Sequence, residues 1–177
     1  PRVRRQRQMC IRDSDSTVEA FKIAQAAGVR TILNPAPAME KVPAELLAVT
    51  DMIVPNETET ETLTGIAITD EVSMLKASAA LHALGISAVI ITIGSKGAFY
   101  DIDGRHGIVP AFKVEAVDTT SAGDTFIGAM SSVLNKDFSN LEDAIRYGNR
   151  ASSIAVQRFG AQPSIPYKNE ITAAEGK

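Results

Sequence analysis

Apolar positions along the chain change their spacing repeatedly, and the changes predict helices and strands in turn. Between Asp70 and Leu84 apolar side chains recur every three or four residues, which is typical of an amphipathic helix, and Gly85 supplies its end. Ala88–Ile93 is almost wholly apolar, as expected for a central strand covered on both faces. The other predicted helices are residues 16–27, 42–48, 56–64, 125–134 and 141–156, and the other predicted strands are residues 29–33, 51–55, 98–102 and 112–117.

Short polar motifs indicate where several of these elements begin and turn. Ser16–Glu19 and Ser139–Glu142 have the spacing of a capping box. In this motif the serine side chain accepts the backbone N–H of the glutamate, and the glutamate side chain accepts the backbone N–H of the serine. Asp103–Gly104 predicts the tip of a hairpin, and two prolines exclude a helix at Asn34–Pro37. Strands that alternate with helices indicate one α/β domain with a largely parallel sheet.

The turns after the predicted strands contain polar residues that could form a site. Asn34, Asn56, Gly94 and Asp118 each lie in such a turn. In open α/β sheets, ligands bind beyond the carboxyl ends of the strands. We therefore expect these four turns to share one edge of the sheet, and this convergence predicts a functional site there.

Charge is distributed unevenly along the chain. Residues 1–12 hold five of the 18 arginine and lysine residues and no acid, so the rest carries 13 basic and 21 acidic side chains. This acidic body argues against a nucleic acid as partner. The basic segment, residues 1–13, is interpreted as a nucleic-acid arm, a targeting piece or a stretch foreign to the fold, and we favour the last. The folded part is then residues 14–177.

Length and composition suit a soluble globular domain. The chain has 177 residues, of which 45% are hydrophobic, enough for one domain with a sizeable core. No apolar run reaches the roughly 18 residues that span a bilayer, so no membrane partner is expected. The single cysteine, Cys10, excludes an internal disulfide and is compatible with a cytoplasmic location.

The segment Asp118–Phe126 offers the strongest candidate chemistry. It joins a predicted strand to a predicted helix, so backbone N–H groups at the helix start are free to attract an anion. Asp124, at this positive end, would act as a base that takes a proton from an attacking hydroxyl. It would serve equally well as the N-cap of the helix. The turn alone leaves both interpretations open.

Two further turns have the composition of phosphate or metal sites, and each also has a structural explanation. Gly94–Gly97 could hold phosphate with its N–H groups, although most turns of this kind only reverse the chain. Asn56 and Glu59 project from one face of a helix start and suit a hydrated Mg²⁺, whereas a capped helix is the more frequent reason for the pair. His82 and His106 have no metal-like spacing and are interpreted as structural or surface residues.

Together these motifs resemble the ribokinase-like family of carbohydrate kinases. Asp118–Phe126 is similar to the family's D-T-x-x-A-G-D-x-F motif, with Ser121 where many members have glycine. Asn56–Glu59 is similar to the N-x-x-E motif, and the likeness runs from about Ser14 to the C-terminus. The resemblance implies a Rossmann-like, mostly parallel sheet flanked by helices. It also implies that the family's N-terminal half and lid are missing from this chain, which would be the C-terminal nucleotide-binding part.

The resemblance implies an ATP-dependent kinase that phosphorylates the 5-hydroxyl of ribose, with Mg²⁺ and K⁺ as cofactors. Asp124 would be the base and would contact the sugar, and the N–H groups of Ala122, Gly123 and Asp124 would stabilise the transferring phosphoryl group. The residues implied in ATP binding are Asn56, Thr92, Gly94, Gly97, Ala122, Gly123 and Asn149. Glu59 would hold Mg²⁺ through water. The implied monovalent-cation site consists of Asp118, Thr120, Ala155, Gly160 and Ser164.

Other functions stay open on the same residues. One is another kinase of the family, such as a fructokinase or nucleoside kinase, because most sugar-contacting residues belong to the missing half. A second is a catalytically inactive nucleotide-binding module, and a third, more remote, is a nucleic-acid binder that uses the arginine-rich start. Family members often dimerise through the lid, so the resemblance implies a homodimer for the full-length protein.

Overall fold

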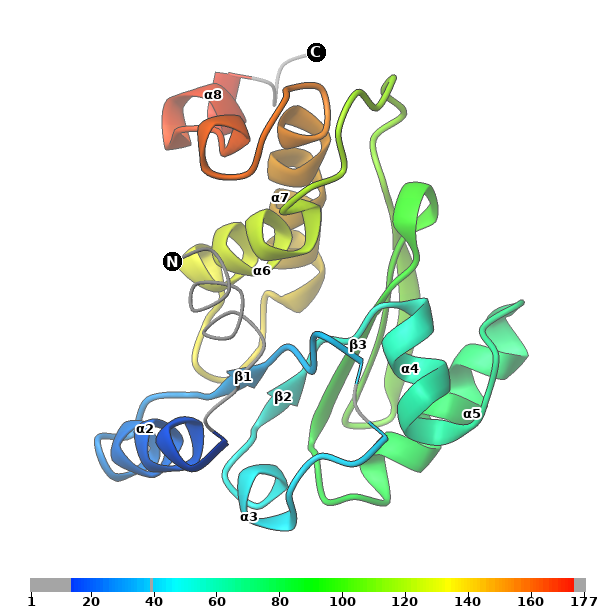
Figure 1. The fold of residues 1–177 in the computed structure, drawn as a ribbon, viewed down its shortest axis with the longest axis vertical. Coiled ribbons are helices and arrows are strands. Elements are labelled where there is room, and N and C mark those ends of the chain that lie inside the picture. Colours follow the sequence, from blue (N-terminus) through cyan, green and yellow to red (C-terminus); the bar gives the residue numbers. More distant parts are fainter. Residues whose placement is uncertain (1–13, 39, 174–177) are drawn as a thin grey trace, which may run out of the picture.

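The computed structural model describes residues 14–38 and 40–173, and within them a five-stranded sheet lies between two layers of helices (Figure 1). Strands β1 to β3 are parallel, and β4 and β5 form an antiparallel hairpin at one side. The strands follow one another across the sheet as β1 (Ile32–Leu33), β2 (Met52–Ile53), β3 (Ala88–Thr92), β4 (Gly97–Ile102) and β5 (Arg105–Pro110). The α/β fold expected from the sequence is confirmed. The basic residues 1–13 lie outside the described residues.

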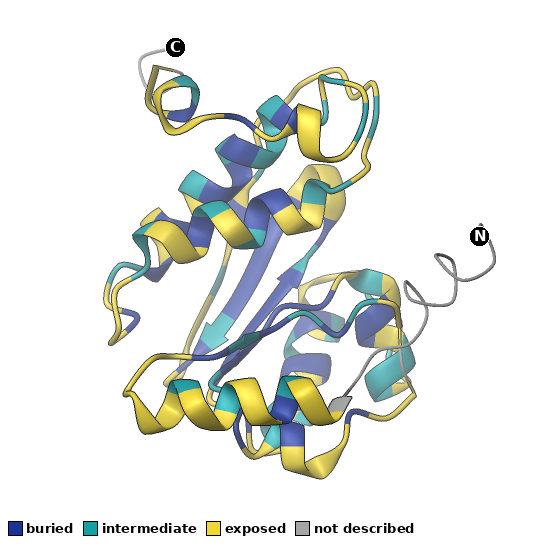
Figure 2. Ribbon diagram, turned by 60° about the vertical axis from the view of Figure 1, so that its left-hand side comes forward, coloured by how far each residue is buried: buried dark blue, intermediate teal, exposed yellow. Residues whose placement is uncertain are grey.

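Helices cover both faces of this sheet (Figures 1 and 2). One layer consists of α2 (Ser14–Ala26), α3 (Ala44–Leu47), α4 (Glu57–Thr64) and α5 (Glu71–His82). The other consists of α6 (Ala122–Val133) and α7 (Leu141–Ala155), with α8 (Lys168–Ala173) beyond α7. The short 3₁₀ turns η1 (Gly94–Lys96) and η2 (Gln162–Ser164) complete the chain.

The strands contribute side chains alternately to two hydrophobic cores. On β3, Val89 and Ile91 pack with the layer of α2 to α5, whereas Ala88 and Ile90 pack with α6 and α7. Successive side chains of a strand point to opposite faces, so a strand covered on both faces must be apolar at every position. This explains why the sequence of β3 is an unbroken apolar run. In Figure 2 the buried stripes of the helices face the sheet and their exposed faces point outward.

Capping residues in the sequence correctly predicted where α4 and α5 begin and end. The N-cap of α4 is Asn56, whose side chain accepts the Glu59 N–H at 2.8 Å, and the helix ends at Gly65 in the left-handed conformation (φ 70°). The N-cap of α5 is Asp70, which forms a reciprocal capping box with Ser73. Both caps satisfy N–H groups that the first helical turn leaves unpaired.

Both capping boxes predicted from serine residues are wrong. Ser16 lies inside α2 rather than before it. The N-cap of α7 is Asn140 and makes no side-chain cap hydrogen bond, so Ser139 plays no capping role there. Glu142 instead accepts the Tyr100 hydroxyl at 2.5 Å, a contact with β4 that competes with capping its own helix.

The strand predicted for residues 112–117 is also wrong, because residues 111–117 form no regular element. Phe112, Val114 and Val117 are between 36% and 49% exposed, unlike the core of a sheet. Phe112, Val114 and Ala116 instead line a cleft that is described below. The alternation of apolar residues is real, but the wall of a cleft produces it rather than strand pairing.

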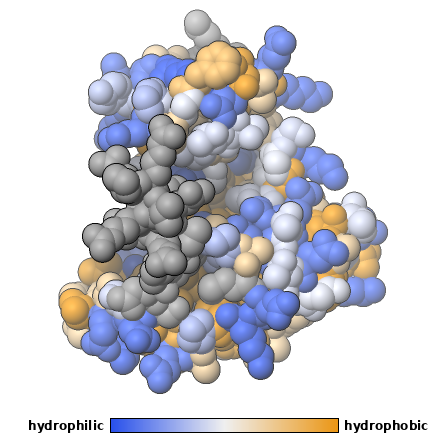
Figure 3. Space-filling model, in the orientation of Figure 1, coloured by the Kyte–Doolittle hydropathy of each residue, from blue (hydrophilic) through white to orange (hydrophobic). Residues whose placement is uncertain are grey.

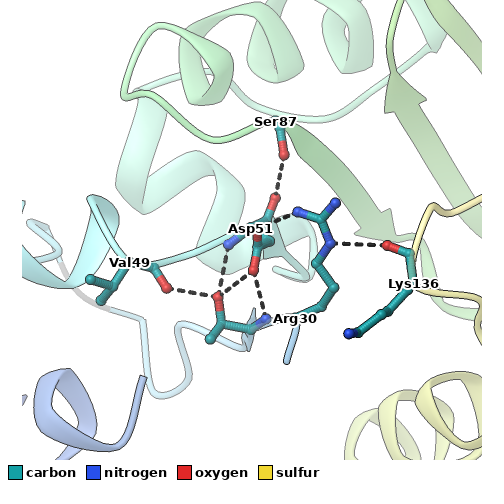
Figure 4. A network of polar contacts seen from close by, with 6 residues as sticks. Arg30, Val49, Asp51, Ser87 and Lys136 are labelled. Carbon is teal, nitrogen blue, oxygen red and sulfur yellow. Dashed lines mark hydrogen bonds and ion pairs between the residues drawn. The ribbon is translucent and has the colours of Figure 1, made fainter. Parts of the chain in front are cut away.

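A polar network joins the residues just before β1 and β2 to the loop between α6 and α7 (Figure 4). The Asp51 carboxylate accepts hydrogen bonds from Arg30 Nη1 and the Thr31 N–H, both at 2.8 Å. Arg30 Nε donates to the Lys136 carbonyl at 2.9 Å, and the Ser87 hydroxyl donates to the Asp51 carbonyl at 2.9 Å. Burial acts to raise the pKa of Asp51, but the hydrogen bonds from Thr31 and Arg30 outweigh it and lower the pKa.

The face of the molecule in Figure 3 is largely hydrophilic, with apolar side chains at a few places along its edges. Among the exposed apolar residues, Phe159 follows α7 and Tyr167 precedes α8, and both are 79% exposed. None of the helices in the described residues combines the length and the apolar character needed to cross a membrane.

Candidate functional site

A cleft of about 550 Å³ opens beyond the carboxyl ends of β2 and β3. One wall is formed by the turns that follow β2 and β3, and the facing wall by residues 111–116 and the helices α6 and α7. The predicted ATP-binding residues that line it are Asn56, Thr92, Gly94, Gly97, Ala122, Gly123 and Asn149. The structure thus brings all seven of these residues to one cleft.

Parallel pairing of β2 with β3 places the first two turns side by side. An isolated parallel bridge joins Asn56 to Thr92, and the Thr92 N–H donates to the Pro55 carbonyl at 2.9 Å. Gly97, at the start of β4, has φ 115°, and a Cβ atom there would lie 2.1 Å from the Val109 carbonyl oxygen. Only glycine permits this close approach of β4 to the end of β5, so the floor of the cleft depends on it.

The start of α6 forms the polar end of the cleft. Ser121 is the N-cap, and Ala122 donates its N–H to the Thr119 carbonyl at 3.2 Å. The N–H groups of Gly123 and Asp124 have no hydrogen-bond partner among the described residues. They are therefore available to an anion, as helix N-termini generally are.

Asp124 lies in the first turn of α6, and its side chain is exposed. The interpretation of Asp124 as the N-cap is wrong, because Ser121 occupies that position. Ser121 itself adopts the left-handed conformation, with φ 61°, and makes no side-chain cap hydrogen bond. A carboxylate is thus presented to solvent next to the two free N–H groups, where a proton acceptor beside a phosphoryl group would be placed.

Asp118 fixes the shape of this turn from outside the cleft. Its carboxylate accepts hydrogen bonds from the N–H groups of Thr120 and Gly160, each at 2.9 Å. The side-chain hydrogen bond with Thr120, followed by the two backbone N–H groups, lowers the pKa of Asp118 to about 2. The carboxylate therefore keeps its negative charge under all physiological conditions.

The predicted monovalent-cation site is only partly connected by direct contacts. Asp118 joins Thr120 and Gly160, as described above. Ser164 belongs to η2, where its hydroxyl donates to the Ala161 carbonyl at 2.7 Å, and Ala155 ends α7. These two residues lie on the segments that flank Gly160 in sequence and make no hydrogen bond to the Asp118 carboxylate.

Glu59 lies deeper than the residues that line the cleft. It is only 4% exposed, and its Oε2 accepts the Asn56 N–H at 2.9 Å and the Asn34 side-chain amide at 3.4 Å. The capped-helix explanation of the Asn56–Glu59 pair therefore holds. Oε1 of Glu59 has no hydrogen-bond partner in the described part of the chain. No group of three or more His, Cys, Asp or Glu residues within that part could hold a metal ion by itself.

The histidines take no part in the cleft. His82 has Nδ1 at 2.8 Å from the Ile86 carbonyl and Nε2 at 3.4 Å from the Asp101 carboxylate, and the Ser78 hydroxyl donates to the same Asp101 oxygen. The serine contacts the aspartate rather than the imidazole, so the three side chains do not form a nucleophilic triad. His106 lies on β5 and is exposed.

Sequence reasoning missed the apolar part of the cleft. The lining residues that it did not assign to the site include Phe112, Val114 and Val156. The alternating apolar positions of residues 112–116 carried the signal, but the same pattern also predicts a strand. Val156 gave no signal at all, because its position beside the cleft arises from the packing of α7.

Comparisons with known proteins identify what this chain is similar to. Residues 12–168 match the sequence profile described as pfkB family carbohydrate kinase. The ribokinase of Staphylococcus aureus (strain COL) is 51% identical over 154 residues, which cover 87% of this chain and 50% of that protein. The ribokinase of Haemophilus influenzae is 46% identical over 151 residues, which cover 85% of this chain and 49% of that protein.

A solved structure gives the same picture in three dimensions. The structure of Arabidopsis thaliana ribokinase complexed with ribose and ATP superposes with a TM-score of 0.83 at 32% identity, covering 90% of this chain and 52% of that one. The chain spans about half the length of the curated relatives that it matches.

Proposed function

The chain belongs to the pfkB family of carbohydrate kinases, and we propose that the protein of which it forms part transfers the γ-phosphoryl group of ATP to the 5-hydroxyl of D-ribose. The observation that carries the proposal is the single cleft lined by all seven predicted nucleotide-binding residues. Gly123 lines this cleft with a free N–H group, and the free N–H group of Asp124 follows it in the first turn of α6. The similarity to ribokinases at up to 51% identity supports ribose as the acceptor.

Asp124 is the base in the proposed transfer. Its exposed carboxylate takes the proton of the attacking hydroxyl, whose oxygen bonds to the γ-phosphorus. The bond between that phosphorus and the bridging oxygen then breaks, and ADP leaves with the electron pair. The N–H groups of Gly123 and Asp124 stabilise the negative charge on the transferring group, because they are fixed before the reaction by the start of α6.

The residues present fit a hydrated Mg²⁺ beside the phosphates. Asn56 lines the cleft, and the unpartnered Oε1 of Glu59 lies in the same capping box, so an amide and a carboxylate oxygen are offered together. Such oxygen ligands suit Mg²⁺, which usually keeps several waters. Bound there, the ion would neutralise charge on the phosphate oxygens; Asn56 and Glu59 would orient its waters.

The residues around Asp118 fit K⁺. An ionised carboxylate whose pKa is about 2 provides the charge, and the carbonyl groups of Thr120, Ala155 and Gly160 with the Ser164 hydroxyl provide neutral oxygens. A cation held by these residues would fix the turn before α6 without touching substrate. Family resemblance further supports a homodimer and a cytoplasmic location for the full-length protein, which sedimentation and cell fractionation would test.

The decisive experiment is the Asp124→Asn variant of the full-length protein. Removing the base while keeping the shape of the side chain is expected to lower kcat by about 10²- to 10⁴-fold. ATP affinity should change little, since the N–H groups of the turn remain. Asp103→Asn, in the exposed tip of the β4–β5 hairpin, is the matched control and should retain full turnover. Turnover of Asp124→Asn close to that of the parent would rule out Asp124 as the base.

A further inference from the structure

An ion pair joins the two ends of the α7–α8 loop, residues 156–167. Arg158 Nη2 lies 2.5 Å from Glu170 Oε1, so a residue near the start of the loop contacts a residue of α8 that is 12 positions away. The other carboxylate oxygen of Glu170 accepts the Tyr167 N–H at 2.8 Å, immediately before α8 begins. The hydrogen bonds from Arg158 and then Tyr167 lower the pKa of Glu170, so the carboxylate is ionised at neutral pH.

Packing holds only a small part of this loop. Its buried residues are Ser164 and Pro166, whereas Phe159 and Tyr167 are each 79% exposed. The helix that follows is better fixed, because Ile171 of α8 is 5% exposed, and α8 lies beyond α7 at the far end from the sheet (Figure 1). A loop whose ends are joined has fewer accessible conformations than a free one. The ion pair to α8 therefore restricts the shape of the loop.

The same stretch carries three of the five residues implied in the monovalent-cation site. Ala155 immediately precedes the loop, and Gly160 and Ser164 belong to it. Gly160 donates its N–H to the Asp118 carboxylate at 2.9 Å. The Ser164 hydroxyl donates its only proton to the Ala161 carbonyl at 2.7 Å, so it can offer only lone pairs to another partner, which suits a cation. The shape of the loop thus governs how these oxygens are arranged around Asp118.

Arg158 and Glu170 are unsuited to act on a cation by direct contact. The guanidinium is positively charged and would repel K⁺, and both oxygens of Glu170 already accept hydrogen bonds. The two side chains are 37% and 34% exposed, so water screens their charges at longer range. Any effect of the pair on the site must therefore pass through the loop that joins them.

We propose that Arg158 and Glu170 are positioning residues of the monovalent-cation site. Their ion pair holds the α7–α8 loop in the shape that brings the oxygens of Gly160 and Ser164 to Asp118. This inference rests on the proposed function, since it assumes that the site binds K⁺. It adds a link by which α8, remote from the cleft, sets the K⁺ requirement of the turn that begins α6.

The test measures, in the full-length protein, the K⁺ concentration that gives half of the maximal effect at constant total salt. Two properties are followed: the rate of phosphoryl transfer and the midpoint temperature of unfolding, which rises when a ligand binds only the folded state. The second readout requires no turnover. Arg158→Met and Glu170→Gln should each raise the half-maximal K⁺ concentration about threefold, whereas the rate at saturating K⁺ should fall by a smaller factor.

The sign of the two effects separates positioning from a direct influence of charge. Removing a positive charge near a cation would by itself strengthen K⁺ binding, and removing a negative charge would weaken it. Positioning predicts that Arg158→Met and Glu170→Gln both weaken K⁺ binding. The double variant should be no weaker than either single variant, because each removes the same contact. Stronger K⁺ binding by Arg158→Met would overturn the inference.

Two further variants serve as controls. Lys22→Met removes an equal charge from the exposed Lys22–Glu19 ion pair of α2 (2.9 Å) and should keep the half-maximal K⁺ concentration of the parent. Arg158→Lys keeps the charge and should lie closer to the parent than Arg158→Met. If Arg158→Met and Glu170→Gln both respond to K⁺ like the parent, the positioning role is refuted.

The parent itself separates this inference from the proposed function. A parent whose unfolding temperature and rate do not respond to K⁺ would refute the proposed cation site and, with it, the role of the ion pair. A parent that transfers no phosphoryl group to ribose would refute the proposed reaction. In that case the unfolding temperatures of the variants in K⁺ would still decide whether Arg158 and Glu170 position the site.

Discussion

The Asp118 carboxylate accepts a hydrogen bond from the Gly160 N–H at 2.9 Å, although the two residues are 42 positions apart in the sequence. The other carboxylate oxygen accepts the Thr120 N–H, also at 2.9 Å. One side chain therefore ties the turn that begins α6 to the loop that follows α7. These two hydrogen bonds therefore help to position the free N–H groups at the start of α6.

We expect the contribution of Asp118 to stability to depend on pH. Its pKa is about 2 in the folded protein, against an ordinary value of 3.8, so the charged form is favoured by folding. A lowered pKa stabilises the fold above the unfolded-state value, and the effect is lost as the pH falls through the folded-state value. Urea unfolding should find Asp118→Asn less stable than the parent at pH 7, with the difference shrinking between about pH 4 and pH 2.

The control for this measurement is Asp103→Asn. The Asp103 carboxylate makes no hydrogen bond with any of the described residues and lies in an exposed hairpin tip. The same loss of charge there removes no hydrogen bond of the described residues, so Asp103→Asn should be as stable as the parent at pH 7. If the difference in free energy of unfolding between Asp118→Asn and the parent stays constant from pH 7 to pH 2, the charge of the carboxylate does not strengthen its two N–H contacts.

A second consequence concerns cations in the full-length protein. If Asp118 supplies the charge of a K⁺ site, K⁺ should raise the rate of phosphoryl transfer above that in Na⁺ alone, and Asp118→Ala should remove the difference. Steady-state rates in the two salts at equal ionic strength measure this directly. The Asp103→Ala variant, with the same loss of charge, should keep the response. Equal rates of the parent in K⁺ and Na⁺ would contradict the assignment.

The elements that the sequence predicted well are those with signals in adjacent residues. α4 has its cap at Asn56 and its stop at Gly65, and β3 is apolar throughout because both faces are covered. The parallel order of β1 to β3 then places the turns after them at one edge, as expected from Asn56 and Gly94. Short-range patterns were therefore sufficient to predict the wall of the cleft that contains Asn56 and Gly94.

The elements that the sequence predicted badly depend on distant contacts. Glu142 had the spacing of a capping box but bonds to Tyr100 on another element. Residues 112–117 alternate like a strand, yet no neighbouring strand pairs with them. α8 went unpredicted because it is short, and its buried residue Ile171 gives no periodicity by itself. In each case the deciding partner is remote in the sequence.

Alanine at two glycines of the cleft should have different effects on stability. At Gly97 a new Cβ would lie 2.1 Å from the Val109 carbonyl oxygen, a backbone atom that cannot swing away. Gly97→Ala is expected to lower the free energy of unfolding by about 3 kcal/mol or more. At Gly123 nothing lies within 4 Å of a new Cβ among the described residues, so Gly123→Ala should fold as stably as the parent.

ATP affinity should show what Gly123 contributes apart from stability. The added methyl of Gly123→Ala stands at the N–H groups proposed to hold phosphate, so we expect ATP affinity to fall about tenfold or more while stability is kept. Chemical denaturation and calorimetric titration of both variants give the two quantities separately. A Gly123→Ala variant that binds ATP as tightly as the parent would place the phosphates elsewhere in the cleft.

Ser121 provides the last prediction, since it occupies a backbone conformation that favours glycine. Its φ of 61° is in the left-handed region, where a Cβ atom costs about 1–2 kcal/mol for most residues. Glycine removes this cost but loses more entropy on folding, so Ser121→Gly should raise the free energy of unfolding by about 0.5–1 kcal/mol. Ser131→Gly is the matched control: it lies in the same helix at an ordinary helical position, is exposed, and should destabilise by about 0.5 kcal/mol. Denaturant unfolding of the two variants should therefore show changes of opposite sign. Destabilisation by both substitutions would mean that Ser121 is held by contacts that outweigh its conformational cost.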